Sequence, residues 1–431
     1  MPKLWILNHY AVGPGESGGT RHFDLARELV KMGWDVSIFA ASVNHIMRRE
    51  THLQSGEKTK QEVHDGVRFF WLRTPVYDGN GPRRIWNMLV YTMSVLRSAW
   101  RRERPESSPE IIIGSSVHLF AAFAAYILAR RHRCRFIFEV RDLWPQAFIE
   151  VFKISEYNPA IWLLRRLEIF LYRKAEKIIV LLPRANEYIE RFGISKEKIF
   201  YIPNGVNLSR YQESSFPFSP QLSNTLNALA DKFIAVYTGS LGSVNGLDTL
   251  LDAARLLQLR GDKHPHFLLV GNGAQKNRLQ QRVVEEDLAN VTFIDPLPKE
   301  YVPMLLQKAN VGIHGFQDLP VFKWGVSPNK VFDYMAAGLP VLLLCRYTHH
   351  NPVEISGGGM VLPPGEAETL AQIITDLAAC PERCAEMSKK ALAYVEQEHS
   401  MKVLGQRFAA VLSSNAGLKS KTAAARTYYT K

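Results

Sequence analysis

Short apolar runs alternate with amphipathic segments along most of the chain. In the first half, the apolar runs predict strands at residues 4–8, 35–40, 67–73, 111–114, 135–140, 177–182 and 198–202. Apolar residues at helical spacing predict helices between them, at residues 21–32, 83–102, 119–131, 162–175 and 184–192. This alternation is typical of a parallel sheet with helices on both faces. The polar residues 44–66 predict a mobile loop.

The same alternation starts again in the second half. Strands are predicted at residues 233–238, 266–270, 291–294, 311–314 and 341–344, and helices at 247–259, 274–285, 300–309, 366–379, 383–397 and 400–413. Between the halves, the turn signal Pro203–Gly205 precedes a stretch rich in Ser, Pro, Gln and Asn that has no periodicity.

These patterns predict an α/β protein with two tandem, Rossmann-like, doubly wound parallel-sheet domains that face each other across a cleft. The predicted boundaries are an N-terminal domain, a linker, a C-terminal domain, a helix that packs back on the N-terminal domain, and a basic, disordered tail. They fall at residues 1–205, 206–231, 232–399, 400–413 and 414–431.

Composition adds a preference for anionic partners. The 431 residues have an ordinary hydrophobic fraction of 46% but a formal net charge of +12. Three clusters in the first half contain much of the excess, at Arg83–Arg104, Arg130–Arg141 and Arg165–Lys177. Such an excess favours phosphate groups, an anionic membrane or nucleic acid. The four cysteines lack zinc-site spacing, which fits a reducing compartment.

The N-terminus and the apolar runs predict a cytoplasmic protein. No signal peptide is recognisable, and no apolar run reaches the ~18–20 residues that span a bilayer. Within residues 83–104, apolar side chains recur at helical spacing between arginines, at Ile85, Trp86, Leu89, Met93, Leu96 and Trp100. This stripe fits either core packing or a basic amphipathic helix on a membrane surface, and both interpretations remain open.

Residues 325–342 predict a seat for a nucleotide diphosphate. A loop ends at Ser327–Pro328, and a short helix then begins with Lys330 in its first turn. The free N–H groups and the dipole of a helix N-terminus suit phosphate, and Lys330 adds a full positive charge. Asp333 lies on nearly the same face and can accept a hydrogen bond from a sugar hydroxyl.

Four glycine-rich or turn-rich loops follow predicted strands, at residues 13–19, 239–246, 271–273 and 325–330. Since ligands bind at the carboxyl ends of parallel strands, we expect these loops to converge on one cleft. No P-loop, strict G-x-G-x-x-G or D-x-D pair is present. The simplest prediction is a metal-free site that uses N–H groups, a lysine and helix dipoles.

In their order along the chain, these segments resemble the retaining glycosyltransferases of family 4, which have the GT-B fold. The resemblance covers roughly residues 3–412. It rests on Gly18–Val36, Val140–Pro145, Ile202–Asn207, Tyr237–Leu250, Val270–Gly273, Ala336–Val341 and Glu354–Ile355. Arg141–Pro145 and Ser327–Gly338 are further similar to bacterial transferases of L-fucosamine and related deoxyaminosugars, which build O-antigen, capsule and other surface polysaccharides.

The positions of these residues after predicted strands and at the helix start, together with the resemblance, give a set of site residues. The catalytic candidates are Asp142, Arg141 and Lys330. The donor-binding candidates are Gly18, Gly19, Ser240, Asn245, Asn272, Gly273, Leu297, Ser327, Asn329, Lys330, Asp333 and Glu354. The acceptor-binding candidates are Arg21, Ser116 and His118.

Several positions depart from the family pattern. Gly325 and Asp333 occupy the positions of its two spaced glutamates. Ser240 and Asn245 stand where the family has Arg and Lys, and Arg141 stands where it has His. We therefore expect Lys330 and Arg141 to supply the missing positive charge.

The implied activity is transfer of a sugar with retention from a nucleotide-diphosphate sugar to a saccharide or lipid-linked acceptor. An N-acetylated deoxyaminohexose is one candidate for the sugar, and a polyprenyl-diphosphate-linked acceptor would place the enzyme on the inner face of the plasma membrane. No cofactor or metal is expected. Two alternatives stay open: a nucleotide-sugar 2-epimerase on the same fold, which needs no acceptor, and a basic nucleic-acid-binding protein.

Overall fold

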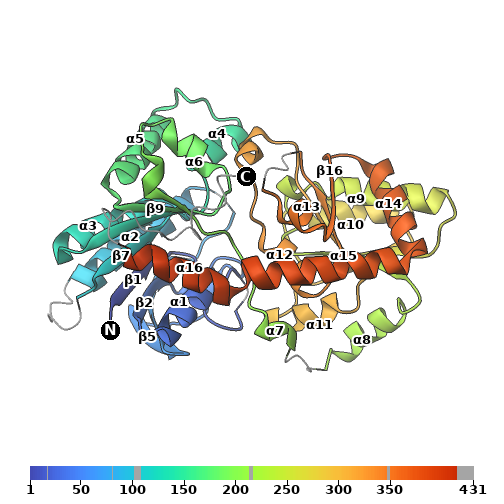
Figure 1. The fold of residues 1–431 in the computed structure, drawn as a ribbon, viewed down its shortest axis with the longest axis horizontal. Helices are drawn as coiled ribbons and strands as arrows, with labels where there is room; N and C mark the ends of the chain where they lie inside the picture. Colours follow the sequence, from blue (N-terminus) through green and yellow to red (C-terminus); the bar gives the residue numbers. More distant parts are fainter. Residues whose placement is uncertain (17, 80, 101–107, 213–216, 347–349, 415–431) are drawn as a thin grey trace. The chain divides into compact units, whose positions relative to one another are not determined.

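The computed structural model describes residues 1–16, 18–79, 81–100, 108–212, 217–346 and 350–414. The chain divides into two compact units (Figure 1). Unit 1 contains Met1–Asn204 and the residues from Met401 onward, and unit 2 contains Gly205–Ser400.

The described residues of unit 1 form an eight-stranded sheet in the order β10-β9-β8-β7-β1-β2-β6-β5. Neighbouring strands are parallel except for β5, which pairs antiparallel with β6 at one edge. A separate short pair joins β3 and β4. The strands are β1 (Lys3–Leu7), β2 (Asp35–Ala41), β3 (Val43–Asn44), β4 (Arg49–Glu50), β5 (Thr59–His64), β6 (Val67–Leu72), β7 (Ile111–Ser115), β8 (Arg135–Val140), β9 (Lys177–Val180) and β10 (Ile199–Tyr201).

Helices cover both faces of this sheet. They are α1 (Arg21–Lys31), α2 (Pro82–Trp100), α3 (Leu119–His132), α4 (Gln146–Phe152), α5 (Pro159–Lys174), α6 (Ala185–Glu190), the 3₁₀ turn η2 (Lys196–Lys198) and α16 (Met401–Ser413). On one face, α16 packs beside α1, and Gly405 lets the two helices approach because a Cβ there would lie 2.6 Å from the Cβ of Glu28. On the other face, Tyr91 of α2 donates a hydrogen bond to the carbonyl of Phe39 in β2, and α3 packs against both α2 and β7.

The prediction of a loop over residues 44–66 is wrong for part of this segment. Thr59–His64 is an edge strand whose side chains are mostly exposed, so it lacks the apolar alternation of a buried strand. Asn44 and Arg49–Glu50 also belong to the short β3–β4 pair.

Unit 2 is built on a six-stranded, fully parallel sheet in the order β13-β12-β11-β14-β15-β16. Its strands are β11 (Phe233–Thr238), β12 (Pro265–Val270), β13 (Val291–Ile294), β14 (Val311–Gly315), β15 (Val341–Leu344) and β16 (Gly359–Leu362). Its α-helices are α7 (Ser209–Gln212), α8 (Pro220–Asn227), α9 (Asp248–Leu259), α10 (Lys276–Glu285), α11 (Val302–Leu306), α12 (Asn329–Ala336), α13 (Pro352–Ser356), α14 (Ala367–Ala379) and α15 (Pro381–Tyr394). The 3₁₀ segments are η3 (Ser243–Asn245), η4 (Lys299–Tyr301) and η5 (Pro320–Trp324), and the π-helical segment η6 (Val395–His399) follows α15.

The predicted linker at residues 206–231 is wrong in its described part. Val206 and three leucines of this segment are buried in the same apolar cluster as α12 and β11, namely Leu222, Leu226 and Leu229. The side chain of Ser219 accepts a hydrogen bond from the N–H of Leu222 and so caps α8. The segment is therefore part of the folded unit 2. The predicted tail lies outside the described residues from residue 415 onward.

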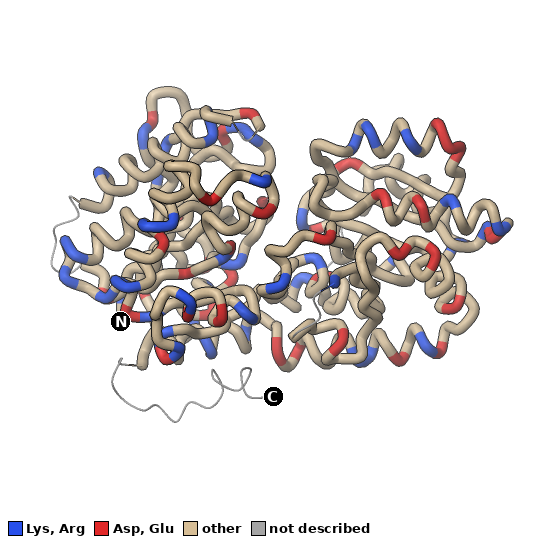
Figure 2. Tube along the Cα trace, turned by 90° about the horizontal axis from the view of Figure 1, so that it is seen from above, with Lys and Arg blue, Asp and Glu red and all other residues tan. Residues whose placement is uncertain are grey.

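Charge divides between the two units (Figure 2). The sequence assigned to unit 1 has 37 Lys and Arg against 21 Asp and Glu, whereas unit 2 has 16 against 20. The positive excess of the chain therefore belongs to unit 1, and any anionic surface that the excess attracts should meet that unit.

The topology also indicates where ligands should bind. In doubly wound sheets, a crevice opens at the carboxyl edge where the strand order reverses. In unit 1 the reversal lies between β1 and β7, and in unit 2 between β11 and β14. The predicted site loop Gly239–Gly246 follows β11 directly, and the predicted loop at residues 13–19 lies between β1 and α1.

Candidate functional site

In unit 2, the loops after β11 and β12 lie against each other at the carboxyl edge. Leu241 N–H donates to the carbonyl of Asn272 at 2.9 Å. A Cβ on Gly271 would lie 1.9 Å from Gly239 O, and one on Gly273 would lie 2.5 Å from the carbonyl carbon of Leu241. Only glycine fits at these two positions, because any side chain would collide with the backbone of the loop after β11. Gly271 and Gly273 therefore allow the two loops to pack closely. Asn272 is exposed on this surface.

The loop after β11 is shaped by side chains that bind its own carbonyls. The buried Asn245 amide and the Tyr237 hydroxyl both donate to Ser240 O, at 2.8 and 2.6 Å. Asn245 therefore fixes the loop, while the Ser240 side chain remains exposed. The predicted donor residues Ser240 and Asn245 thus have different roles.

Lys330 lies in the first turn of α12, beside this loop. Its Nζ donates to the Tyr237 hydroxyl at 2.8 Å and lies 4.2 Å from the centre of the Tyr237 ring. A Cβ on Gly239 would be 3.0 Å from Nζ. Burial lowers the pKa of Lys330 to about 7, against the opposing effect of Asp333. A partly desolvated ammonium group at a helix N-terminus is suited to an incoming phosphate.

Asp333 pairs with a residue that the sequence did not single out. The Tyr211 hydroxyl donates to Asp333 Oδ1 at 3.0 Å. On the next position of α12, the Tyr334 hydroxyl accepts from the N–H of Thr238 at 2.8 Å and ties the helix to the end of β11. These two contacts fix the orientation of α12, and with it the position of Lys330.

The remaining donor candidates of unit 2 have different surroundings. Asn329 is exposed at the start of α12, and Ser327 is partly buried just before it. Leu297 packs against the apolar cluster under α12. Glu354 is exposed on the short helix α13, after β15. The described hydrogen bonds bring Ser240, Asn245 and Lys330 into one network with Tyr237. Asp333 acts electrostatically on Lys330, and the described contacts leave Glu354 outside this network.

In unit 1, a buried carboxylate organises the carboxyl edge. Glu139 of β8 accepts hydrogen bonds from Arg21 Nε at 3.1 Å, His22 Nε2 at 2.6 Å and Ser115 Oγ at 2.8 Å. Burial raises the pKa of Glu139, but His22 and Arg21 outweigh that effect and hold it well below its usual range. Glu139 was not among the predicted site residues, because a single glutamate inside an apolar strand carries no motif.

Arg21 is fully occupied by this network and by the backbone. Besides Glu139, its guanidinium donates to the carbonyls of Pro203 and Ile202, the latter at 2.8 Å. Its exposed fraction is 2%. Arg21 therefore anchors the end of unit 1 rather than offering a free cation to an acceptor, which changes the role that the sequence suggested.

His118 caps α3 and binds a second histidine. The N–H of Ala121 donates to His118 Nδ1 at 3.2 Å, so Nε2 carries the proton and donates to His9 Nδ1 at 2.9 Å. Burial lowers the pKa of His118 to about 3. The His9 ring stacks between Tyr10 and Tyr91, each 4.4 Å away. Because His118 is buried, it shapes the loops after β1 and β7 from below.

The other candidates of unit 1 lie around the end of β8. Ser116 is buried, and its hydroxyl accepts from the N–H of Arg141 at 3.0 Å. The Arg141 side chain is partly exposed and Asp142 is exposed, so both remain accessible to a ligand. Gly18, at a φ of 140°, lies against Val12, where a Cβ would be 3.0 Å from Cγ1; Gly19 is partly exposed beside it.

The described residues contain neither a metal-binding cluster nor a membrane-spanning helix. Within those ranges, no group of three or more His, Cys, Asp or Glu side chains is placed to hold a metal ion. No described helix combines the length and apolar character needed to cross a bilayer. No disulfide joins any of the four cysteines, all of which lie within the described residues.

Within the described residues, the apolar stripe on α2 is exposed and does not pack into the core. The side chains of Ile85, Trp86 and Trp100 are 53%, 61% and 43% exposed, and Leu89 and Met93 are exposed as well. The buried face of α2 is formed instead by Asn87, Met88, Tyr91, Thr92, Val95 and Ala99. Core packing of the stripe is therefore wrong for these five residues. Arg101, Arg102 and Arg104 lie outside the described residues.

Comparisons with known families and proteins agree with this architecture. Residues 18–205 match the family model described as a glycosyl transferase 4-like domain, and residues 219–393 match that described as glycosyl transferases group 1. The chain is 24% identical to WcaI of Escherichia coli (strain K12), provisionally named a colanic acid biosynthesis glycosyl transferase, over 73% of this chain and 76% of that protein.

Solved structures show the same fold. Sucrose-phosphate synthase from Thermosynechococcus elongatus aligns with a TM-score of 0.71 at 19% identity, covering 96% of this chain and 98% of that one. Anabaena HepE in complex with UDP-glucose aligns with a TM-score of 0.68 at 17% identity, covering 96% and 100%. The predicted GT-B fold, with two parallel-sheet α/β domains, is confirmed.

Proposed function

Since this chain is a glycosyltransferase composed of a glycosyl transferase 4-like domain and a group 1 domain, we propose that it builds a bacterial surface polysaccharide. In this proposal, the enzyme moves a sugar from a nucleotide-diphosphate sugar to a saccharide or lipid-linked acceptor and retains the anomeric configuration. Unit 2 binds the donor and unit 1 the acceptor. The similarity to WcaI supports the polysaccharide pathway, and the UDP-glucose complex of HepE supports a nucleotide-sugar donor.

The observation that carries the proposal is the position of Lys330. Its ammonium group lies at the start of α12, next to the reversal of strand order in unit 2 and within hydrogen-bond distance of Tyr237. As the bond between the sugar and the diphosphate breaks, negative charge develops on the leaving phosphate. A preorganised cation and the free N–H groups of a helix N-terminus stabilise that charge.

We assign the roles of the remaining candidate residues from the exposure of their polar groups. Ser240, Asn272, Ser327 and Asn329 offer polar groups around the diphosphate and the nucleoside, and Asp333 holds a sugar hydroxyl. In the same proposal, Arg141 and Asp142 act in catalysis, and Gly18 and Gly19 bind the donor. The leaving phosphate takes the acceptor proton. Exclusion of water by the bound substrates limits hydrolysis.

The sugar we propose is an N-acetylated deoxyaminohexose. Its support is the similarity of Arg141–Pro145 and Ser327–Gly338 to bacterial transferases of such sugars. We further propose that the enzyme works on the inner face of the plasma membrane, on a polyprenyl-diphosphate-linked acceptor. The exposed apolar stripe on α2 and the positive excess of unit 1 support this placement.

One experiment tests the activity. The purified chain is screened by thermal shift against uridine- and guanosine-diphosphate sugars, and the stabilising donor is then incubated with polyprenyl-diphosphate-linked saccharides. We expect transfer that persists in EDTA, with the product in the same anomeric configuration as the donor. Conversion of the donor to its C2 epimer in the absence of acceptor would instead identify a 2-epimerase. Dependence on added magnesium would exclude the metal-free mechanism.

A further inference from the structure

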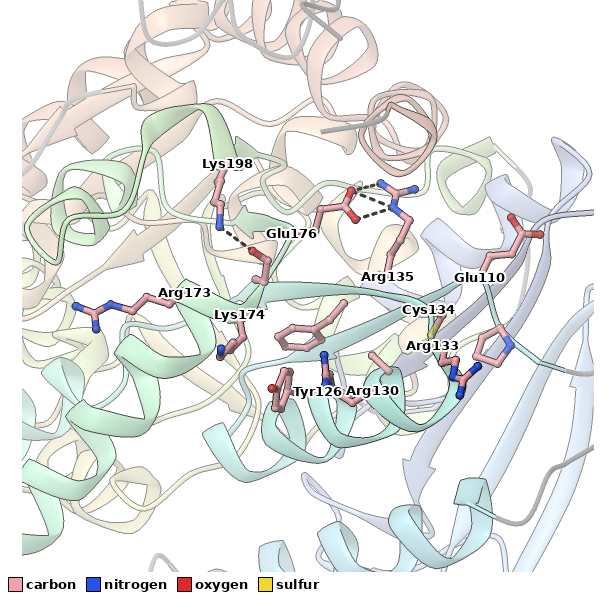
Figure 3. A pocket seen from close by; sticks show the side chains of 14 residues that line it. Glu110, Tyr126, Arg130, Arg133, Cys134, Arg135, Arg173, Lys174, Glu176 and Lys198 are labelled. Carbon is pink, nitrogen blue, oxygen red and sulfur yellow. Dashed lines mark hydrogen bonds and ion pairs between the residues drawn. The ribbon is translucent and has the colours of Figure 1, made fainter. Parts of the chain in front are cut away.

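A cavity of about 710 Å³ opens on unit 1, at the amino edge of its sheet (Figure 3). It is lined by the last turns of α3 and α5 and by residues at the starts of β7, β8, β9 and β10. The proposed glycosyl-transfer residues of this unit lie at the opposite, carboxyl edge. Strand β8 runs from Arg135 in the cavity to Val140 beside Arg141, a distance of roughly 17 Å. The cavity is therefore separate from the glycosyl-transfer site.

The lining of this cavity is strongly basic. Six of its side chains are cationic and two are carboxylates. One pair is internal, because Arg135 binds Glu176 through Nε at 3.0 Å and Nη2 at 2.6 Å. Arg130, Arg133 and Arg173 are exposed and form no ion pair among the described residues. In Figure 3, Arg130 extends from the last turn of α3 and Arg133 from just beyond it, with Lys174 on α5.

The negative ends of the helices at the cavity offset only part of the positive charge of its lining. Lys and Arg often occupy the last turn of a helix because they compensate its negative end, which carries about half an elementary charge. Two helices, α3 and α5, end at the cavity. Their ends together offset about one positive charge. With both carboxylates also counted, about three positive charges remain without compensation.

The cavity also has an apolar wall. The rings of Tyr126 and Phe136 meet edge to face at 5.7 Å and line the cavity between the basic groups. Its volume lies within the ~300–1,000 Å³ that is usual for sites of small organic ligands, and it is larger than a bare phosphate requires. A ligand that combines a multiply charged anion with an organic part would match both features.

We propose that this cavity is a second binding site, which holds the phosphate or diphosphate group of a phosphorylated ligand. Arg130, Arg133 and Lys174 contact the anion, and Tyr126 contacts the organic part. The ligand is either a soluble organic phosphate or the headgroup of a membrane lipid. A membrane lipid is one of these two sources because the exposed apolar stripe of α2 lies close to the end of α3. The guanidinium of Arg131, next to Arg130 in the chain, lies 5.6 Å from the ring of Trp100 on that stripe.

The test uses the full chain and inorganic diphosphate as the probe. To keep the proposed donor site from contributing, all proteins carry Lys330→Gln. Binding is measured by calorimetry, and amide hydrogen exchange reports where the probe binds. The test variant adds Arg130→Gln and Arg133→Gln. The matched control adds Arg49→Gln and Lys58→Gln, which remove the same charge at exposed positions of unit 1 that do not line the cavity.

We expect diphosphate to slow exchange at residues 130–135 and 173–176 in the parent and the control. Loss of the two arginines should weaken binding by about tenfold per arginine, because each charge-assisted hydrogen bond contributes about 1.4 kcal/mol, which is tenfold in affinity. Equal binding by the test and control variants, or protection elsewhere in the chain, would overturn the proposal.

A second arm distinguishes the two sources. The same proteins are sedimented with vesicles of phosphatidylcholine, with and without phosphatidylglycerol. Loss of phosphatidylglycerol-dependent binding in the test variant alone, with competition by diphosphate, identifies a lipid headgroup. Diphosphate binding that leaves sedimentation unchanged identifies a soluble phosphate. If the two variants also sediment alike and neither binds diphosphate more weakly than the parent, the cavity is not a phosphate site.

Discussion

Lys330 donates a hydrogen bond to the hydroxyl of Tyr237 and also lies over its ring, 4.2 Å from the centre. The two residues are 93 positions apart and come from α12 and β11. The tyrosine therefore aims the ammonium group at the loop that follows β11. Substitutions of these two residues can therefore measure how much Lys330 contributes to turnover.

Replacing Lys330 with Ala should lower turnover by roughly ten- to a thousandfold, as loss of one transition-state donor does. Tyr237→Phe is the second test variant, because it removes the hydroxyl that positions the ammonium group but keeps the ring beneath the lysine. Steady-state kinetics with the identified donor measure both variants. A folded Lys330→Ala variant with the turnover of the wild type would remove Lys330 from the mechanism.

Binding of the donor nucleotide should depend on pH through Lys330. Burial lowers its pKa to about 7 in the free protein, and a bound diphosphate must raise that pKa by favouring the charged form. Affinity is therefore fully present below about pH 7 and falls as pH rises toward the pKa of the complex. Calorimetry over this range should show the decrease in the wild type. In Lys330→Arg, whose side chain stays charged, only the titration of the nucleotide itself should remain.

The Arg21–Glu139 pair should contribute strongly to the stability of unit 1. Arg21→Met leaves the buried Glu139 carboxylate with one cation fewer, and breaking a buried pair in this way destabilises by about 3–5 kcal/mol. Arg49→Met removes an exposed arginine of the same unit and should change stability by less than about 0.5 kcal/mol. Urea unfolding followed by fluorescence compares the two. If Arg21→Met changed the free energy of unfolding as little as Arg49→Met does, the Arg21–Glu139 pair would not contribute to the stability of unit 1.

Gly271 should not tolerate even a methyl group. A Cβ there would meet Gly239 O at 1.9 Å, and the φ of 145° is unfavourable for other residues. Gly271→Ala should therefore lower stability by at least about 2 kcal/mol or displace the loop that follows β11. Gly261→Ala is the control, because its φ of 73° is also positive but nothing lies within 4 Å of its Cβ. Thermal unfolding with and without donor measures both effects.

Membrane association should depend on the exposed tryptophans of α2. The double change Trp86→Ser and Trp100→Ser should reduce co-sedimentation with phosphatidylglycerol vesicles and leave thermal stability nearly unchanged, because both side chains are exposed. Leu259→Ser, at an exposed leucine of unit 2, is the control. Unchanged sedimentation of the double variant would argue against a membrane role for this helix.

The parallel strands and the place of Lys330 in the first turn of a helix could be predicted because their signals are local. Buried strands are short apolar runs, and the helix start at Asn329 follows a proline and precedes a basic residue. Two failures were also local. Thr59–His64 is a polar edge strand, so it lacks the apolar alternation that would have predicted a strand. The segment after Ser219 contains a helix, and the helical spacing of its leucines, Leu222, Leu226 and Leu229, was obscured by the polar residues around them.

Other features depend on contacts between distant positions. Tyr211 binds Asp333 across 122 residues, and Glu139 of β8 accepts hydrogen bonds from two other elements, α1 and β7. No spacing rule connects such residues in a single sequence. The same limit explains His118, where an exposed acceptor contact was expected and a buried helix cap with a histidine partner is present.

The packing of α16 on unit 1 has a consequence for how the protein is made. Leu404, Phe408 and Leu412 are buried in the core of unit 1, and Lys177 and Arg135 donate to carbonyls of Val411 and Leu412. The ribosome delivers these residues only after all of unit 2. Unit 1, whose synthesis begins first, therefore cannot complete its core until unit 2 has been synthesised. A stop codon placed shortly before residue 404 should release a chain whose early half, not its late half, is degraded.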